Sequence, residues 1–128
     1  MNFVFDHVSR ATPNLERSVT FYKAFGCEEE KRVRSDEQGL TRVVLNLPGS
    51  ASFLQFIAFD DARFTPPGES WADHLKFITT DFDMSLELLV RAGGIVTREP
   101  YRLLGRAARI AFVADPDGHQ LELVEKIL

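Results

Sequence analysis

Cysteine is nearly absent from this chain. Its 128 residues include one, Cys27, which excludes an internal disulfide and fits a reducing compartment. Basic blocks are short, the longest being residues 30–34, and the net charge is −4, which argues against nucleic-acid binding. No apolar run approaches membrane-spanning length, and residues 1–7 lack the basic-then-apolar pattern of a signal peptide. We therefore expect a cytoplasmic protein whose partners are neither nucleic acids nor membranes.

The residues that are present suffice for one folded domain spanning residues 1–128. Hydrophobic residues make up 45% of the chain, enough to bury a core at this length. Phe occurs 11 times against one Trp and two Tyr, so some Phe side chains are expected to line a cavity as well as to fill the core. Cys27 follows a glycine expected to end a helix, with no His or Lys close in sequence to activate it, which favours a structural thiol.

An internal repeat is the most informative feature of the chain. When the sequence is shifted by 67 residues, His7 falls on His74 and Gln55 falls on Glu122, and all four side chains can bind divalent metals. The residues expected to start and stop a helix match as well, and so do two arginines: Thr12 with Thr79, Ser18 with Ser85, Gly26 with Gly93, and Arg42 with Arg109. The repeat predicts two copies of one supersecondary unit, at 3–59 and 70–126, with a linker at about 60–73.

Each copy is expected to be a β-α-β-β-β module. The first begins with a strand over 3–11 whose alternation places Phe3, Phe5, His7 and Ser9 on one face. Thr12-Pro13-Asn14 is typical of a helix start and Gly26 of a helix end. Further strands are expected near 27–34, 40–47 and 52–59.

The second copy follows the same plan. A strand over His74 to Thr79 precedes a helix that Asp81 or Asp83 caps and that runs to about Ala92, before strands near 95–99, 107–114 and 119–126. The expected fold class is therefore α+β, with two tandem β-α-β-β-β modules forming a cupped mixed sheet. His7, Gln55, His74 and Glu122 are expected to line that cup.

Two stretches of the chain resemble a known group. His7 with residues 13–22 and Phe25-Gly26, and the closing run 110–125, are similar to the opening and the C-terminal signature of the vicinal oxygen chelate superfamily. That superfamily includes glyoxalase I, methylmalonyl-CoA epimerase, fosfomycin-resistance enzymes, extradiol dioxygenases and non-catalytic bleomycin-resistance proteins. The resemblance implies a homodimer and one divalent metal ion held by His7, Gln55, His74 and Glu122. Such mixed nitrogen and oxygen ligands fit Zn, Ni, Co, Mn or Fe(II).

The residues themselves leave more than one interpretation open. A lone strand histidine usually bonds the neighbouring backbone, but two at equivalent repeat positions, with Glu122 on an apolar strand, favour a metal site. Gln55 fits a ligand or a hydrogen-bonded strand residue equally well. Arg42 and Arg109 fit either the binding of an anionic substrate or a solvated or salt-bridged pair.

The expected activity is that of a glyoxalase-like lyase or isomerase that stabilises a metal-chelated enediolate of a small carbonyl substrate. Glu122 would then be both a metal ligand and the catalytic proton carrier. The glutathione anchors of glyoxalase I are not matched, since Ala11 and Phe59 stand at those positions. The alternatives are a metal-free small-molecule binding protein of the bleomycin-resistance type and a single-domain enzyme similar to extradiol dioxygenases.

Overall fold

The computed structural model describes residues 2–68, 71–103, 105 and 107–127, so linker residues 69 and 70 lie outside the described part. The chain separates into two compact units, Met1–Thr65 and Pro66–Leu128, called here the N-terminal and C-terminal modules. Neither helix in the described part of the chain is long and apolar enough to cross a membrane.

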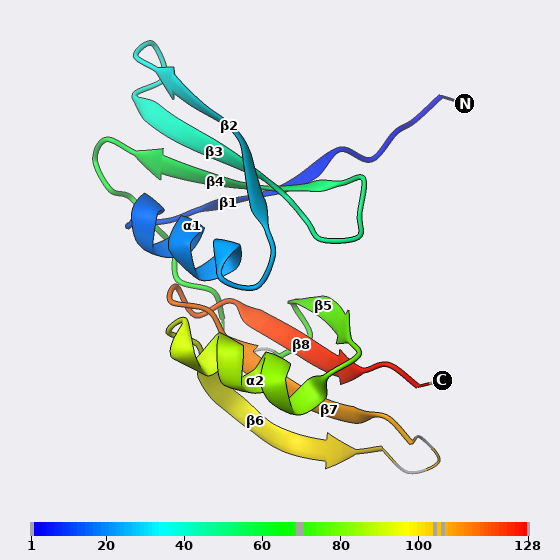
Figure 1. The fold of residues 1–128 in the computed structure, drawn as a ribbon. Helices are drawn as coiled ribbons and strands as arrows, with labels where there is room; N and C mark the ends of the chain where they lie inside the picture. Colours follow the sequence, from blue (N-terminus) through cyan, green and yellow to red (C-terminus); the bar gives the residue numbers. More distant parts are fainter. Residues whose placement is uncertain (1, 69–70, 104, 106, 128) are drawn as a thin grey trace. The chain divides into compact units, whose positions relative to one another are not determined.

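The N-terminal module is a four-stranded mixed sheet with one helix on one face (Figure 1). Its sheet order is β1-β4-β3-β2, in which β1 runs parallel to β4 and the other neighbours are antiparallel. The elements are β1 (His7–Ala11), α1 (Leu15–Lys23), β2 (Glu28–Ser35), β3 (Leu40–Asn46) and β4 (Phe53–Phe59).

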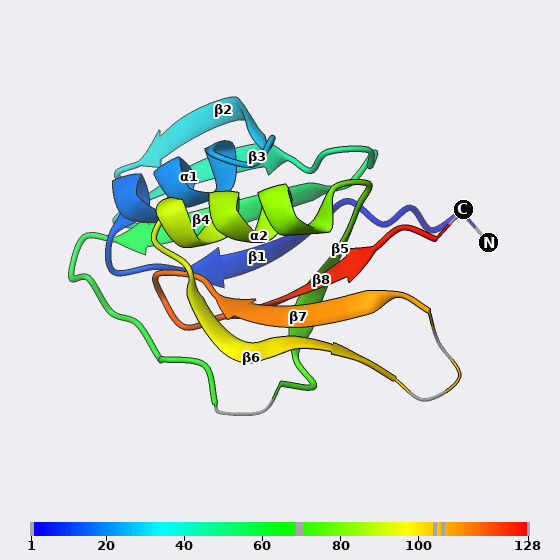
Figure 2. The same ribbon diagram turned by 60° about the horizontal axis from the view of Figure 1, so that its bottom comes forward.

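The C-terminal module repeats this topology, with sheet order β5-β8-β7-β6 and β5 parallel to β8 (Figure 2). Its elements are β5 (His74–Thr79), α2 (Phe82–Arg91), β6 (Ile95–Arg102), β7 (Arg109–Ala114) and β8 (Gln120–Glu125). The predicted α+β fold of two tandem β-α-β-β-β modules is confirmed.

The first strand is shorter than its sequence predicts. β1 begins at His7, whereas Phe3, Val4 and Phe5 are exposed and lie outside the sheet. The reason is that β1 pairs only with β4, and β4 begins at Phe53, the register partner of His7. The Phe53 amide donates to the Asp6 carbonyl, and this hydrogen bond comes just before the paired residues of the two strands. Residues with strong β-propensity stay unpaired where no neighbouring strand exists. β6, in contrast, extends to Arg102, beyond the predicted end at 99.

Alternation along the strands places an apolar layer beneath each helix. In the N-terminal module Tyr22 of α1 contacts Phe56 of β4, with ring centroids 5.2 Å apart. The side chains that share the helix-facing side of the sheet there are all fully buried: Val43, Leu45, Leu54 and Phe56. In the C-terminal module the buried side chains of this layer are Ala111, Val113, Leu121 and Leu123, with Phe82 and Leu89 from the helix. Each sheet therefore turns its other face away from its helix.

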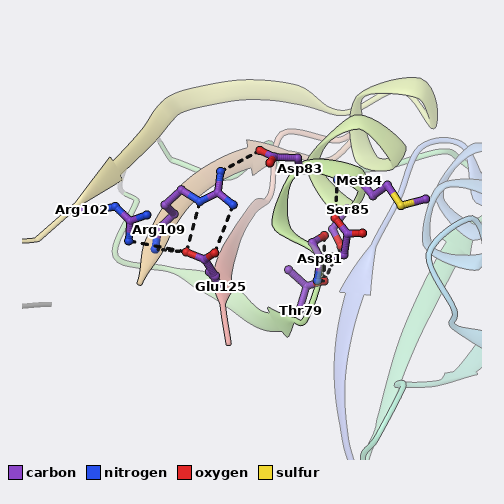
Figure 3. Close-up of polar contacts among 8 residues, drawn as sticks. All are labelled: Thr79, Asp81, Asp83, Met84, Ser85, Arg102, Arg109 and Glu125. Atoms are coloured by element: carbon purple, nitrogen blue, oxygen red, sulfur yellow. Dashed lines mark hydrogen bonds and ion pairs between the residues drawn. The ribbon is translucent and has the colours of Figure 1, made fainter. Parts of the chain in front are cut away.

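Both helices begin with the same hydrogen-bonded arrangement. Asn14 and Asp81 are the N-caps, and each accepts from the backbone N–H three residues on at 3.1 Å. The threonine two residues before each cap bonds a serine hydroxyl in the first turns of the helix, with oxygens 2.7 Å apart in the Thr12–Ser18 pair and 2.5 Å in the Thr79–Ser85 pair (Figure 3). The repeat thus conserves polar contacts and not only element order.

Replacing Asp81 by Ala should destabilise the protein by about 1 kcal/mol, because the N–H of Met84 would lose its acceptor at the start of α2. Thermal and urea unfolding of the variant measure this loss. Asn14→Ala at the equivalent cap of α1 should cost a similar amount. A cost below ~0.3 kcal/mol for both variants would contradict the capping role.

Each helix ends on a left-handed glycine, at Gly26 (φ +114°) and Gly93 (φ +110°). The residue after each glycine then returns a hydrogen bond to the helix, from Cys27 to Tyr22 and from Gly94 to Leu89. Cys27 is buried, and burial raises the pKa of its thiol to about 12. It is therefore protonated at neutral pH and packs as a small apolar side chain, as expected.

β7 and the end of β6 are one residue out of phase with β3 and β2. Gln55 pairs with Val44, and Glu122 pairs with Phe112, so the offset is 67 for the first pair of positions but 68 for the second. The hairpin loop before the last strand accounts for the difference, since residues 115–119 are one fewer than residues 47–52. An ungapped alignment therefore assigns β3 and β7 to the wrong register, and a one-residue slip reverses which face each side chain occupies.

Candidate functional site

In the N-terminal module, His7 and Gln55 lie on the sheet face that points away from α1. Gln55 alternates with Leu54 and Phe56, which face the helix, and it pairs with Ser9 of β1. His7 is two residues before Ser9 on the same face of β1. Both side chains line a hollow of about 520 Å³. Its other lining residues are Asp6, Glu30, Lys31, Val33, Arg42, Val44 and Phe53.

Neighbouring oxygen atoms fix how these two side chains are oriented. His7 Nδ1 lies 2.7 Å from an Asp6 carboxylate oxygen, and Gln55 Nε2 donates to the Ser9 hydroxyl at 3.0 Å. The carboxylate favours a proton on Nδ1, which leaves the lone pair on His7 Nε2. The Ser9 bond occupies the amide nitrogen of Gln55 and leaves its carbonyl oxygen as the available donor atom. One nitrogen and one oxygen are thus presented by this module.

The C-terminal module holds the equivalent pair. His74 Nε2 lies 3.9 Å from a carboxylate oxygen of Glu122, and both side chains are largely buried. His74 Nδ1 is 2.8 Å from the Trp71 carbonyl oxygen, an acceptor that requires the proton on Nδ1. Phe112 packs edge-on against the imidazole, with ring centroids 5.3 Å apart. Lys76 is the register partner of Glu122 on β5, where the N-terminal module has Ser9.

The chemistry of these donor atoms fits a divalent metal ion. In both histidines an oxygen engages Nδ1 and leaves Nε2 to coordinate, which is the usual arrangement of metal-binding imidazoles. Each module presents one imidazole nitrogen and one side-chain oxygen. Within the described residues no three His, Cys, Asp or Glu side chains gather into a single cluster.

The two arginines predicted to bind substrate occupy opposite faces of their sheets. Arg42 pairs in register with Ile57, two residues from Gln55, and lies on the face of the ligand pair. Arg109 lies on the helix side of its sheet, where it bonds Glu125 and Asp83 and its guanidinium carbon sits 4.6 Å from the centre of the Phe82 ring (Figure 3). The structure therefore favours the salt-bridged interpretation of Arg109 over the binding of an anionic substrate.

The ion pair explains what Arg109 does instead. The guanidinium of Arg109 lowers the pKa of Glu125, so this carboxylate stays ionised and joins β7 to β8 on the helix side. The register slip explains why the two arginines differ, because Arg42 corresponds in structure to Ile110 and not to Arg109.

Sequence reasoning missed the groups that orient the ligands. Ser9 was placed on the His7 face by alternation, and its pairing with Gln55 follows from the parallel register. Asp6 gave no such signal, because its repeat mate Asp73 has no corresponding role and the Trp71 carbonyl serves His74 instead. A backbone carbonyl carries no mark in the sequence.

Comparisons with known proteins agree with this architecture. A sequence model of a family described as "Glyoxalase/Bleomycin resistance protein/Dioxygenase superfamily" matches residues 4–123. A putative lactoylglutathione lyase of Brassica oleracea var. gemmifera is 28% identical over 124 residues, covering 95% of this chain and 44% of its own length. A lactoylglutathione lyase of Haemophilus influenzae is 26% identical, and the match covers 93% of this chain and 90% of that protein.

The similarity extends to solved structures. Glyoxalase I from Zea mays superposes with a TM-score of 0.78 at 22% identity, covering 97% of this chain and 45% of that chain, which shows a common fold. This chain therefore spans under half the length of the first plant relatives that it matches.

Proposed function

This chain belongs to the glyoxalase/bleomycin resistance protein/dioxygenase superfamily, and from that premise we propose that it is a lyase or isomerase dependent on a divalent metal ion. One observation carries the proposal: at His7 and His74 alike, an oxygen engages Nδ1 and leaves Nε2 available beside an oxygen-bearing side chain. His7 is exposed, so core packing does not account for its orientation, and the same arrangement recurs at His74. The relatives named lactoylglutathione lyase support the reaction class.

His7, Gln55, His74 and Glu122 would hold the metal ion. A bound divalent cation supplies a Lewis acid that stabilises negative charge developing on substrate oxygens, by several kcal/mol in typical cases. Asp6, Ser9 and the Trp71 carbonyl keep the first three ligands in their orientations. Because only Glu122 is anionic, the set keeps the cation electrophilic.

Glu122 is the proton carrier in this proposal. It is the one carboxylate among the four, and its side chain is largely buried on the sheet face that also carries Phe112 and Val124. The carboxylate takes a proton from the carbon that carries the hydroxyl group and returns it to the adjacent carbonyl carbon. A hydroxyl proton moves between the two oxygens in the same step, so an α-hydroxycarbonyl compound is isomerised with no change in redox balance.

The substrate is proposed to be a small carbonyl compound with two neighbouring oxygens, such as a hemithioacetal. Ala11 and Phe59 stand where the family resemblance places glutathione anchors, so the thiol part of that substrate is expected to differ from glutathione. Activity toward hemithioacetals of methylglyoxal with several thiols, followed by thioester absorbance, tests this proposal.

Protein purified without chelator should contain about one equivalent of a divalent metal per chain. His7→Ala and His74→Ala each remove a proposed ligand, and each should lower the affinity for the metal at least about tenfold. Elemental analysis measures the content, and thermal shifts with Ni, Zn, Co or Mn measure the affinity. His119→Ala, in the hairpin between β7 and β8, is the control and should keep its metal. Wild-type protein with little metal and no thermal shift would leave a metal-free binding protein as the better description.

Mixing the two histidine variants tests whether the four ligands of one metal ion come from a single chain or from two copies of the chain. In a homodimer that shares its ligands across two copies, random reassociation of His7→Ala with His74→Ala restores about one quarter of the sites. Ligands drawn from a single chain leave every site of the mixture defective. Light scattering of the wild type establishes whether the expected homodimer forms.

A further inference from the structure

Arg42 is a charged side chain whose hydrogen bonding is incomplete. Its Nε atom is buried and has no hydrogen-bond partner in the described part of the chain. Its Nη2 donates to the Gln38 side-chain oxygen at 3.3 Å, a long bond from an exposed turn residue. A buried guanidinium N–H without an acceptor destabilises a folded chain, so this arrangement requires a compensating role.

Two other arginines of the same sheet are paired with carboxylates, whereas Arg10, on the helix side of β1, also has a buried nitrogen without a partner among the described residues. Arg32 bonds Glu29 and Glu16, and Arg34 bonds Asp60 and Asp36. These pairs are exposed, and they show that acidic partners are plentiful in this module. Arg42 has no carboxylate partner among the described contacts, and it differs from them in lying on the face that carries His7 and Gln55.

The acidic groups that line the hollow are already engaged. Asp6 bonds His7, and Glu30 accepts from the Asn46 amide at 2.8 Å. Lys31 lines the same hollow and adds a second positive charge. The two carboxylates keep their charge and balance the two cations, so an anion would be held by the unused donors of Arg42 and not by an excess of positive charge.

The strand register sets the distance from Arg42 to the ligand pair. Arg42 is the diagonal neighbour of Gln55 across β3 and β4, a relation that separates Cα atoms by about 7–8 Å. Val33 on β2 and Ile57 on β4 are the register partners of Arg42. Val44, two residues further along β3 on the same face, is the register partner of Gln55. These apolar neighbours strengthen an ion pair by lowering the local dielectric constant.

We propose that Arg42 binds a carboxylate or phosphate at the far end of the substrate, separated by a few bonds from its two neighbouring oxygens. The proposal rests on the proposed function, since it assigns the substrate class of that site: small carbonyl compounds that carry an anionic group. Arg42 lines the hollow, and a turn of its side chain that frees the buried Nε–H would present two neighbouring N–H donors to two oxygens of such a group, the geometry that guanidinium matches best.

Two pairs of small ligands isolate the distal anion. L-malate is lactate with a second carboxylate, and 3-phosphoglycerate is glycerate with a phosphate, so each pair shares the same α-hydroxy acid end. Zinc-loaded wild-type protein should bind malate or 3-phosphoglycerate at least about tenfold more tightly than its partner compound. Calorimetry gives the affinities, and the preferred pair distinguishes a carboxylate substrate from a phosphate substrate.

The variants Arg42→Met and Arg109→Met form a matched comparison. Arg42→Met keeps an apolar stem against Val33 and Ile57 and should equalise the affinities within each pair. Arg109→Met removes a cation from the helix side and should lower stability while leaving the preference intact. In the NMR spectrum of the wild type, the Arg42 Nε–H signal should move with malate or 3-phosphoglycerate and not with lactate or glycerate.

The outcomes separate this inference from the proposed function. A stationary Arg42 Nε–H signal with all four ligands, together with equal affinities, overturns the inference even if the protein isomerises hemithioacetals. A signal that moves in protein that binds no metal supports the anion site and refutes the metal-dependent reaction. Equal loss of preference in both variants would show that overall charge, and not Arg42, selects the anion.

Discussion

Replacing Glu122 by Gln should lower kcat on hemithioacetal substrates by about 10³-fold and leave most of the bound metal in place. The amide keeps an oxygen donor of nearly the same shape, so coordination survives, whereas it cannot accept and return a proton. Gln55 occupies the equivalent place on β4, so an amide side chain is accommodated at this strand position in the other module. Steady-state kinetics and elemental analysis of the same preparation measure the two effects.

Glu125→Gln is the matched control for this variant. Glu125 lies on the same strand, three residues away and on the helix side, where it bonds Arg109. Its substitution should reduce stability modestly and leave kcat within about twofold. Full activity of Glu122→Gln would show that its carboxylate moves no proton, and an oxygen-dependent reaction at the same residues would then be the better hypothesis.

Gly94→Ala should destabilise the protein by about 3 kcal/mol, the largest loss of stability expected from any single methyl group in this chain. A Cβ at residue 94 would lie 2.6 Å from a Val113 methyl carbon and 2.8 Å from the Leu89 carbonyl oxygen. The second contact involves helix backbone, which also accepts the Gly94 N–H, so the clash cannot be relieved by rotating a side chain. Thermal unfolding should show a Tm lower by roughly 10–15 °C.

Cys27→Ala tests the same position in the other module. The N-terminal module accommodates a side chain after its helix-ending glycine, and removing the buried sulfur should cost only about 1 kcal/mol. Similar losses for the two variants would contradict the argument that close backbone approach, and not burial in general, makes Gly94 sensitive.

The repeat and the helix ends could be predicted because they depend on local chemistry. Asn14 and Asp81 accept hydrogen bonds from nearby amides, and Gly26 and Gly93 adopt a backbone conformation that side chains disfavour. These interactions span only a few residues, so the sequence records them directly. The strand positions of His7, Gln55, His74 and Glu122 followed from the same repeat.

The misassigned features depend on pairing between distant strands. Arg42 and Arg109 match in the sequence repeat, but the face on which Arg109 lies follows from the length of a hairpin loop and not from its own neighbours. The start of β1 depends on where β4 begins, and the Trp71 carbonyl that orients His74 is a backbone group. None of these can be read from residue type alone.

The shorter hairpin has a consequence for how duplicated modules diverge. A difference of one residue in the loop leaves β1 and β4 in phase with β5 and β8, so His7 still corresponds to His74 and Gln55 to Glu122. The same difference moves each residue of β7 to the opposite face of its sheet from its sequence equivalent on β3. Ile110 therefore stands where the other module has Arg42. A single change in loop length can thus give two sister modules different surface chemistry without any substitution in the strands themselves.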